Sequence, residues 1–286
     1  MVKKTSFLAG ILVVIGLIGV IFTIPSMLKS SKVLEEKVIH NHDITNIAVE
    51  TDNGVVELLP TDNEKISVEV TGNIPKNQKY NFNVDEKGNT VNIEFKEKGW
   101  KLINFNFFSK GIKIKVYVPN KTYERIQAET NNGRVYATDL NVDDILLSTD
   151  NGRIQLENVK GKTIEAESSN GRIELNNVTA TSMNIQSDNG RIQLNDVDGN
   201  IKSSSKNGGI TLKTNDIDHS IDLSSNNGKI VVQTKSEPQN ATIVSNTDNG
   251  KITIFGNSNQ HTVYGEGKNK INLKSNNGNI TVERGE

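Results

Sequence analysis

A six-residue motif recurs along nearly the whole chain and restricts the possible folds more than any other feature. It reads Ser or Thr, any residue, Asn-Gly, any residue, then Ile or Val. From Gly133 to Gly190 the copies are 19 residues apart, and the later intervals are 18, 20, 22 and 28 residues. Self-similarity at such a period is typical of repeat architectures, in which each unit buries its apolar face against its neighbours. The nine copies place their glycine at Gly54, Gly133, Gly152, Gly171, Gly190, Gly208, Gly228, Gly250 and Gly278.

Apolar residues keep fixed offsets from these glycines. They stand seven and five residues before the glycine and two and four residues after it, with Ser203 and Ser245 as polar exceptions. Polar residues fill the positions between them, as in the segment from Arg153 to Glu157. An alternation of period two indicates β-strands with one buried face. The pattern therefore predicts that each unit consists of two short strands joined by an Asn-Gly turn.

Two all-β folds fit such units. Asn-Gly is a strong signal for a type I′ hairpin turn, and successive hairpins would form an antiparallel meander. A meander, however, does not require a constant 19-residue period or the same residue type at the same offset. Coils stacked in parallel do, because each residue then lies about 4.8 Å above its equivalent. We therefore predict a parallel β-solenoid of about 19-residue coils, with columns of Asn and Ser/Thr side chains bonding along the stack and with glycine supplying a positive φ at each corner.

One segment interrupts the period near the start of the array. Residues 60–121 lack the motif but contain four further strand patterns, with the hairpin loop 85–89 between two of them. We expect this insertion to form an antiparallel sheet that covers the first end of the solenoid, since a bare sheet edge invites aggregation. The first repeat unit and this cap would occupy residues 44–122, and the solenoid repeats residues 123–286.

The N-terminus predicts a membrane anchor. Lys3 and Lys4 precede an uncharged, apolar run over residues 7–24, which is long enough for a helix to span about 27 Å of hydrocarbon. The basic flank favours the cytoplasmic side, so residues after 28 would be extracytoplasmic. We expect an uncleaved, single-pass transmembrane signal anchor over residues 1–28 and a juxtamembrane linker over 29–43. A cleaved signal peptide is the competing interpretation.

The anchor and the Ser/Thr-x-Asn-Gly-x-Ile units together resemble the bacterial putative-adhesin family of unknown function. The similarity is greatest to its LiaG-like, membrane-anchored envelope proteins of Gram-positive bacteria, and it covers about residues 40–286 plus the anchor. The resemblance implies a place at the outer face of the cell membrane and a link to envelope stress or adhesion. It brings no ligand, cofactor or active site, so no functional residue is transferred from it.

A basic column is the first candidate binding surface. Arginine directly follows the turn glycine in four successive units, and Lys229 and Lys251 continue the column less evenly. Stacked in a solenoid, these side chains would form a positive stripe able to bind phosphates or carboxylates. Alternatively they point to solvent and pair with Asp150, Glu157, Glu174 and Asp188, in exposed ion pairs of little energetic weight. The four arginines are Arg134, Arg153, Arg172 and Arg191.

Aromatic residues gather in the segment 100–108 of the insertion. Exposed, they would form a docking patch or a tip that dips into the membrane, since exposed aromatic side chains concentrate binding energy. Buried, they would close the base of the cap sheet, as the alternation at Phe105 and Phe107 also suggests. The aromatic residues of this candidate surface are Trp100, Phe105, Phe107 and Phe108.

Composition excludes several kinds of site. The chain has no Cys, which excludes disulfides and thiolate metal sites, and its four His lie in different segments, so no catalytic triad is suggested. A net charge of −1 argues against nucleic-acid binding. Asp residues precede some Asn-Gly pairs and could bind calcium between coils, although capping of the turns by the Asp side chains is the simpler explanation of their position. We expect no cofactor and no metal.

These features favour a noncatalytic interaction or scaffold module of the cell envelope. Its partners would be the cytoplasmic membrane, through the N-terminal helix, and either anionic wall polymers or an envelope-stress membrane protein. The alternative is a carbohydrate-active enzyme, a hydrolase or lyase acting on cell-wall polysaccharide. Glycoside hydrolysis needs two carboxylates about 5–10 Å apart, which outward pairs such as Glu165 and Glu167 could supply.

Overall fold

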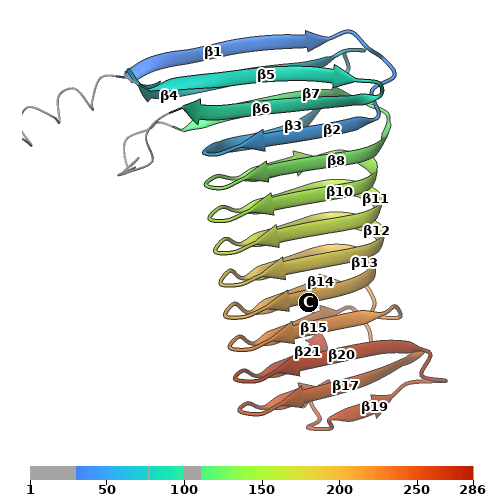
Figure 1. The fold of residues 1–286 in the computed structure, drawn as a ribbon. Helices are drawn as coiled ribbons and strands as arrows, with labels where there is room; N and C mark the ends of the chain where they lie inside the picture. The colour runs from blue at the N-terminus through green and yellow to red at the C-terminus, as the bar shows by residue number, and fades with distance from the viewer. Residues whose placement is uncertain (1–29, 77, 99–110, 286) are drawn as a thin grey trace, which may run out of the picture.

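The computed structural model describes residues 30–76, 78–98 and 111–285. These residues form an all-β rod of 21 strands (Figure 1). The predicted membrane anchor over residues 1–28 lies outside the described residues. Within the described ranges, no helix has the length and apolar character needed to cross a membrane.

Each coil of the rod contributes one strand to each of two faces. We call them the leading face, whose strands run into the Asn-Gly turns, and the following face, whose strands leave those turns. The leading face contains β2 (Asn46–Thr51), β8 (Thr122–Thr130), β10 (Asn141–Thr149), β15 (Ile221–Ser225), β17 (Ala241–Thr247) and β20 (Asn269–Ser275). The following face contains β3 (Gly54–Thr61), β9 (Val135–Thr138), β14 (Ile210–Thr214), β16 (Ile230–Thr234), β18 (Ile252–Ile254) and β21 (Ile280–Arg284).

Three long strands cross from one face to the other. They begin in the following face of one coil and bend into the leading face of the next, so the edge opposite the Asn-Gly turns has no separate loop in these coils (Figure 1). Non-glycine residues with positive φ mark the bend, and their side chains are the short polar ones that tolerate this conformation. The strands are β11 (Ile154–Ser168), β12 (Ile173–Ser187) and β13 (Ile192–Ser205), with Asn158, Asn177 and Asp196 at φ of 51–53°. Asp139, at φ 54°, takes the same position between β9 and β10.

Parallel pairing between successive coils confirms the solenoid over the hairpin meander. Strand β10 pairs in parallel with β8 on one side and with β11 on the other. Ile154 lies opposite Ile173, which in turn lies opposite Ile192, a shift of one 19-residue repeat at each step. Equivalent side chains therefore form continuous columns along the rod, as the constant offsets in the sequence predict.

The core is a thin layer between the two faces. Ile126, Ile145 and Ile164 of the leading face are each completely buried, as are Ile154 and Ile173 of the following face. Burying one such side chain contributes about 1.5–3 kcal/mol, but only if a neighbouring coil covers it. Stability is thus shared between coils rather than held within one.

The inserted segment forms the cap, which combines parallel and antiparallel pairing. Strand β6 (Thr90–Lys98) lies parallel to β2, and β7 (Ile112–Pro119) lies parallel to β3, so the insertion first adds one further rung. Strands β5 (Lys79–Lys87) and β4 (Ile66–Pro75) then pair antiparallel with β6 and β7, respectively. The expected antiparallel sheet is therefore only the outer part of the insertion.

The segment 29–43, expected to be a linker, instead contains a ten-residue strand. Residues 30–39 form strand β1 (Ser30–Ile39), which pairs antiparallel with β4 along its whole length. Its inward side chains Val33 and Ile39 are buried, and Glu35 accepts a hydrogen bond of 2.7 Å from the Tyr80 hydroxyl of β5. The charged residues between them hid this alternation in the sequence, because a single-layer edge strand needs few apolar positions.

The last coils stack out of chain order. Strand β20 pairs with β15 on one side and with β17 on the other, and β21 likewise lies between β16 and β18. The coil at 269–284 thus sits between the coils at 221–234 and 241–254, as the red strands of Figure 1 show. Strand β19 (His261–Val263) pairs antiparallel with β17 beside this end of the rod.

Candidate functional site

The Asn-Gly turns form one straight edge of the rod, and their asparagines are hydrogen-bonded into a ladder. The Nδ2 of Asn151 donates to Oδ1 of Asn132 at 2.8 Å, and the Nδ2 of Asn170 donates to Oδ1 of Asn151 at 2.8 Å. The pattern continues through both out-of-order coils, from Asn227 to Asn277 and from Asn277 to Asn249. The complete ladder is Asn53, Asn132, Asn151, Asn170, Asn189, Asn207, Asn227, Asn277 and Asn249.

The first asparagine of the ladder lies near a carboxylate of the cap. Burial raises the pKa of Glu97, while hydrogen bonds from Gln78 and Asn53 act in the opposite direction. The amides all donate toward this end of the rod, so the Nδ2 of Asn53 has no asparagine before it and donates to Glu97 instead. Nothing in the motif predicts Glu97, because it belongs to the insertion and meets the ladder only in three dimensions.

Glycine is required at these turns by close packing rather than by a positive φ, which corrects the expectation from the sequence. A Cβ on Gly171 would overlap the carbonyl oxygen of Gly152 in the preceding coil, and a Cβ on Gly152 would overlap that of Gly133. None of these three glycines has a φ in the left-handed region. The absence of a side chain therefore lets successive turns approach at the spacing of the strands.

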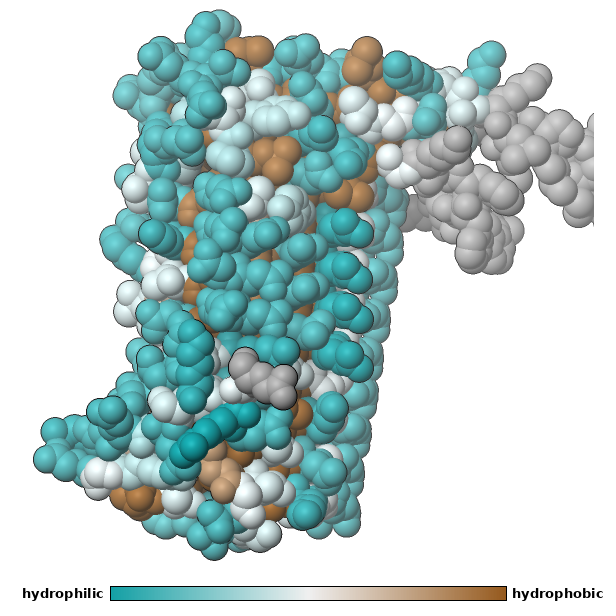
Figure 2. All heavy atoms as spheres, turned by 180° about the vertical axis from the view of Figure 1, so that it is seen from behind, coloured by the Kyte–Doolittle hydropathy of each residue, from teal (hydrophilic) through white to brown (hydrophobic). Residues whose placement is uncertain are grey.

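The arginine column lies beside the ladder, on the following face. Arg134, Arg172 and Arg191 are exposed and Arg153 is half-buried. Their backbones are held in register, because the amide of Ile154 donates to the carbonyl of Arg172 at 3.0 Å and equivalent bonds join the other coils. Successive rungs place the four side chains about 4.8 Å apart along the rod. Figure 2 views this face and shows it to be hydrophilic along much of its length.

Three of the four arginines are exposed, as the alternative of solvent-facing ion pairs expects, but none of the four forms a salt bridge among the described residues. Asp188 forms its salt bridge with Lys206 instead, at 2.9 Å, and Glu157 accepts a hydrogen bond of 3.1 Å from the Tyr136 hydroxyl. Asp150 and Glu174 form no salt bridge in the described part of the chain, and neither does any of the four arginines. Other basic residues do, including Lys113 with Glu57, Arg125 with Asp144 and Lys162 with Asp143.

The column has defined ends. Val55 takes the equivalent position in the coil before Arg134, and Gly209 takes it in the coil after Arg191. Lys229 follows one rung later, but the inserted C-terminal coil then places Asn279 between it and Lys251. Four consecutive guanidinium groups therefore make up the continuous part of the positive surface.

The aromatic candidates Trp100, Phe105, Phe107 and Phe108 lie outside the described residues. Their neighbours in the chain, Lys98 at the end of β6 and Gly111 before β7, belong to the cap end of the rod.

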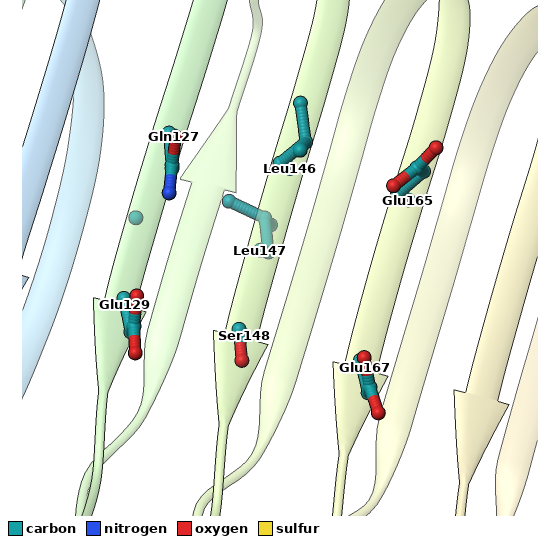
Figure 3. A pocket seen from close by; sticks show the side chains of 8 residues that line it. Gln127, Glu129, Leu146, Leu147, Ser148, Glu165 and Glu167 are labelled. Carbon is teal, nitrogen blue, oxygen red and sulfur yellow. The ribbon is translucent and has the colours of Figure 1, made fainter.

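A shallow hollow on the leading face holds the carboxylates considered for an enzyme (Figure 3). Ser148 of β10 lies between Glu129 of β8 and Glu167 of β11, with Glu165 two residues earlier on the same strand as Glu167. The hollow has a volume of about 120 Å³. Ligand pockets usually enclose about 300–1,000 Å³, so this hollow does not enclose a sugar unit away from water.

Metal binding gains no support from the described residues. They contain no group of three or more His, Asp and Glu side chains that could hold an ion, which includes the Asp positions before the Asn-Gly turns. Two of these Asp residues have other interactions. Asp188 forms a salt bridge with Lys206, and Asp52 lies near Glu97 and raises the pKa of Glu97.

Comparisons with known proteins identify a family and several structural neighbours. Residues 44–283 match the family model described as Toastrack DUF4097. No functionally curated protein matches the chain closely enough to indicate a relationship. Among solved structures, a putative cell adhesion protein from Clostridium sporogenes is 14% identical and aligns over 90% of this chain and 100% of its own, with a TM-score of 0.28. A putative adhesin from Bacteroides fragilis is 18% identical over 88% of this chain and 98% of its own, with a TM-score of 0.46. A putative adhesin from Parabacteroides merdae is 15% identical over 88% and 96%, with a TM-score of 0.41.

Proposed function

The chain belongs to the Toastrack DUF4097 family, and on this premise we propose that it is a noncatalytic, adhesin-like binding module of the cell envelope. Its ligand is an anionic polymer that lies along the arginine column. The observation that carries this proposal is the set of four guanidinium groups on successive rungs, at Arg134, Arg153, Arg172 and Arg191, without a carboxylate partner among the described residues.

Unpaired like charges held in a row are costly unless something neutralises them. At about 4.8 Å between rungs the guanidinium groups lie well within one Debye length of each other, so they repel at physiological salt. The fold could have relieved this repulsion with alternating carboxylates, as it does for Arg125 and Asp144 on the leading face. An anionic ligand would relieve it instead.

Repetition makes weak individual contacts sufficient. One exposed Arg–carboxylate pair contributes about 0.2–1 kcal/mol. When a polymer has bound one arginine, its next charges are already close to the following ones, so each further contact forms at a high effective concentration. A rigid row of identical sites suits a repetitive polymer better than a compact ligand.

Membrane attachment is the second part of the proposal. The uncharged run over residues 7–24 with Lys3 and Lys4 before it supports an anchor whose helix keeps its basic end in the cytoplasm. Ser30 lies in β1, at the cap end of the rod, only six residues after this run. An anchor attached there would leave the coils projecting outward from the membrane, where they could reach wall polymers.

Binding of the full chain to purified Gram-positive wall fragments tests the proposal. The experiment compares the double variant R153E/R172E with K202E/K274E, which makes the same change in charge on exposed leading-face residues. The full-length protein is kept in a neutral detergent, and circular dichroism checks that both variants keep their β-structure. We expect R153E/R172E to lose most wall binding and K202E/K274E to retain it. Equal binding by both variants would show that the arginine column is not the binding surface.

A further inference from the structure

Resting on the proposed function, we infer that the polymer is an extended polysaccharide with one carboxylate on each sugar ring. It runs parallel to the rod, with one ring on each coil from Arg134 to Arg191. Two features support this class of ligand: the spacing of the guanidinium groups, and the amide ladder that lies directly beside them.

The spacing of charges is fixed by the backbone. Arg153, Arg172 and Arg191 directly precede β11, β12 and β13, and parallel pairing of these strands spaces the arginine backbones by the strand separation of about 4.8 Å. One ring of an extended 1,4-linked polysaccharide advances its chain by about the same distance. Successive rings of such a chain are turned by about half a turn, so the carboxylates of alternate rings face the column and meet every second guanidinium without strain accumulating along the polymer. The planar fork of arginine suits a carboxylate.

The neighbouring ladder supplies groups for the sugar hydroxyls. An asparagine amide has two N–H donors and two acceptor lone pairs. The ladder uses one donor and one lone pair of Asn132, Asn151 and Asn170, so each keeps one of both kinds, and all three side chains are exposed. The second N–H of Asn189 donates to the Ser169 carbonyl at 3.4 Å. The coils of Arg134, Arg153 and Arg172 thus present a charged group for a carboxylate next to a neutral donor and acceptor for hydroxyls.

The other side of the arginine column is also mostly neutral. Two residues after each arginine the outward positions are Tyr136, Gln155, Glu174 and Gln193, all half-buried. Three of the four are uncharged and can hydrogen-bond to a sugar. Glu174 is the one residue in this row that repels an anion, so its replacement by Gln should strengthen binding of a carboxylate polymer.

Phosphate polymers fit the same arginines less well. Inorganic polyphosphate has charges closer together than the rungs and has no hydroxyl groups for the amide ladder. A poly(glycerol phosphate) chain has charges farther apart, so they fall out of step with the rungs. Both share the anionic chemistry of the proposed function, and both serve as discriminating probes.

The decisive experiment measures the affinity of the full chain, in neutral detergent, for fluorescent oligogalacturonates of one to six rings. Because Val55 and Gly209 end the column, we expect the affinity to rise up to four rings, by about two- to fivefold for each further carboxylate that faces the column, and to rise little beyond. The methyl-esterified oligomers, which have the same length without the charge, should bind at least tenfold more weakly than the free acids at four rings. E174Q should bind the free acids more tightly, and K202E/K274E should bind them as the wild type does.

The outcomes separate this inference from the proposed function. If polyphosphate or poly(glycerol phosphate) binds through the arginines more tightly than the four-ring uronate, the column is a polyanion site but the ligand class inferred here is wrong. Equal affinity for free acid and methyl ester, or no increase with length, overturns the inference as well. If no anionic polymer binds, the proposed function fails with it.

Discussion

In four successive motifs the first residue is a serine that hydrogen-bonds to the glycines of two successive coils. The Oγ of Ser168 accepts a hydrogen bond from the amide of Gly171 at 2.8 Å and donates to the carbonyl of Gly152 at 3.1 Å. The same pair of bonds recurs at Ser187, Ser205 and Ser225. One small hydroxyl therefore fixes the turn within its coil and the distance to the coil before it.

Replacing Ser168 by Ala tests this role. The substitution removes both hydrogen bonds and leaves two backbone groups without them, which should lower the free energy of unfolding by about 1–3 kcal/mol. Ser203→Ala is the matched control, because its buried hydroxyl has no hydrogen-bond partner among the described residues and alanine stands at the same position in two other coils, at Ala128 and Ala166. Denaturant unfolding should show S203A to be as stable as the wild type or more stable. A larger loss for S203A than for S168A would contradict the assignment.

The turn glycines give a second prediction at this scale. Gly171→Ala should destabilise the protein by about 2–4 kcal/mol, because the new methyl group overlaps the Gly152 carbonyl oxygen and the two turns must move apart. Gly111→Ala is a suitable control, since no atom of the described residues, its chain neighbours apart, lies within 4 Å of the position of its Cβ. Thermal unfolding measures both. A G171A protein with wild-type stability would mean that the turns are not packed as closely as described.

Among the elements, the stacking order of the last coils is the feature with the most direct structural consequence. Ser224 of β15 lies opposite Lys274 of β20, and Lys274 lies opposite Asn246 of β17. In a simple sequential stack, Ser224 would instead lie next to Asn246. The coil at 269–284 fills the position between them because its motif offers the same apolar and hydroxyl positions as every other coil.

Cysteine cross-linking tests this order, and the chain has no cysteine of its own. S224C/K274C and N246C/K274C each place two thiols on adjacent strands, within reach of a short cross-linker. S224C/N246C places them two rungs apart, about 10 Å, which is beyond a direct disulfide. We expect efficient linking in the first two variants and little in the third, as measured by mass spectrometry of digested protein. Preferential linking in S224C/N246C would establish sequential stacking.

The loop between β14 and β15 provides a pH-dependent element. Burial lowers the pKa of His219 from its ordinary value of 6.5, and nearby Asp216, Asp198 and Asp218 oppose this shift. The unfolded chain therefore takes up a proton more readily than the folded one, so stability is complete above about pH 6.5 and declines as the pH falls below it. The His219 Nε2 is buried without a partner among the described residues, which adds to the cost of charging the ring.

Thermal unfolding between about pH 7.5 and pH 5 tests this element. We expect the wild type to lose more stability on acidification than H219Q does, while H261Q, which alters an exposed histidine, should follow the wild type. Parallel curves for wild type and H219Q would show that His219 does not couple folding to pH.

For the molecule as a whole, the repeat determines how much of the structure can be predicted from sequence. Two strands per coil, parallel stacking and the buried offsets follow from a constant period, because each is repeated at every copy of the motif. The arginine column follows for the same reason, since Arg134 and its equivalents keep one position relative to the glycine. What the sequence did not indicate is what occurs once, or between coils.

Four features illustrate this limit. Strand β1 has few apolar residues because it covers only one layer, so its charged positions resemble a linker. The need for glycine at Gly171 arises from a carbonyl in another coil, which local turn chemistry does not reveal. The order of the last coils depends on which of several equivalent rungs fills a position, and their motifs are too similar to distinguish. The position of Glu97 beside the ladder likewise depends on the folded insertion.

The whole-molecule claim is that four equivalent arginines bind one anionic polymer together. The most direct measurement replaces Arg134, Arg153, Arg172 and Arg191 by Gln, first singly and then in combinations of two, three and four, and determines the affinity of the full chain for the same wall polymer. Equivalent sites predict that the logarithm of the affinity falls by a similar step with each arginine removed, whichever one it is. A series in which one arginine accounts for the whole loss, or in which the fourfold variant binds as the wild type does, would contradict the account.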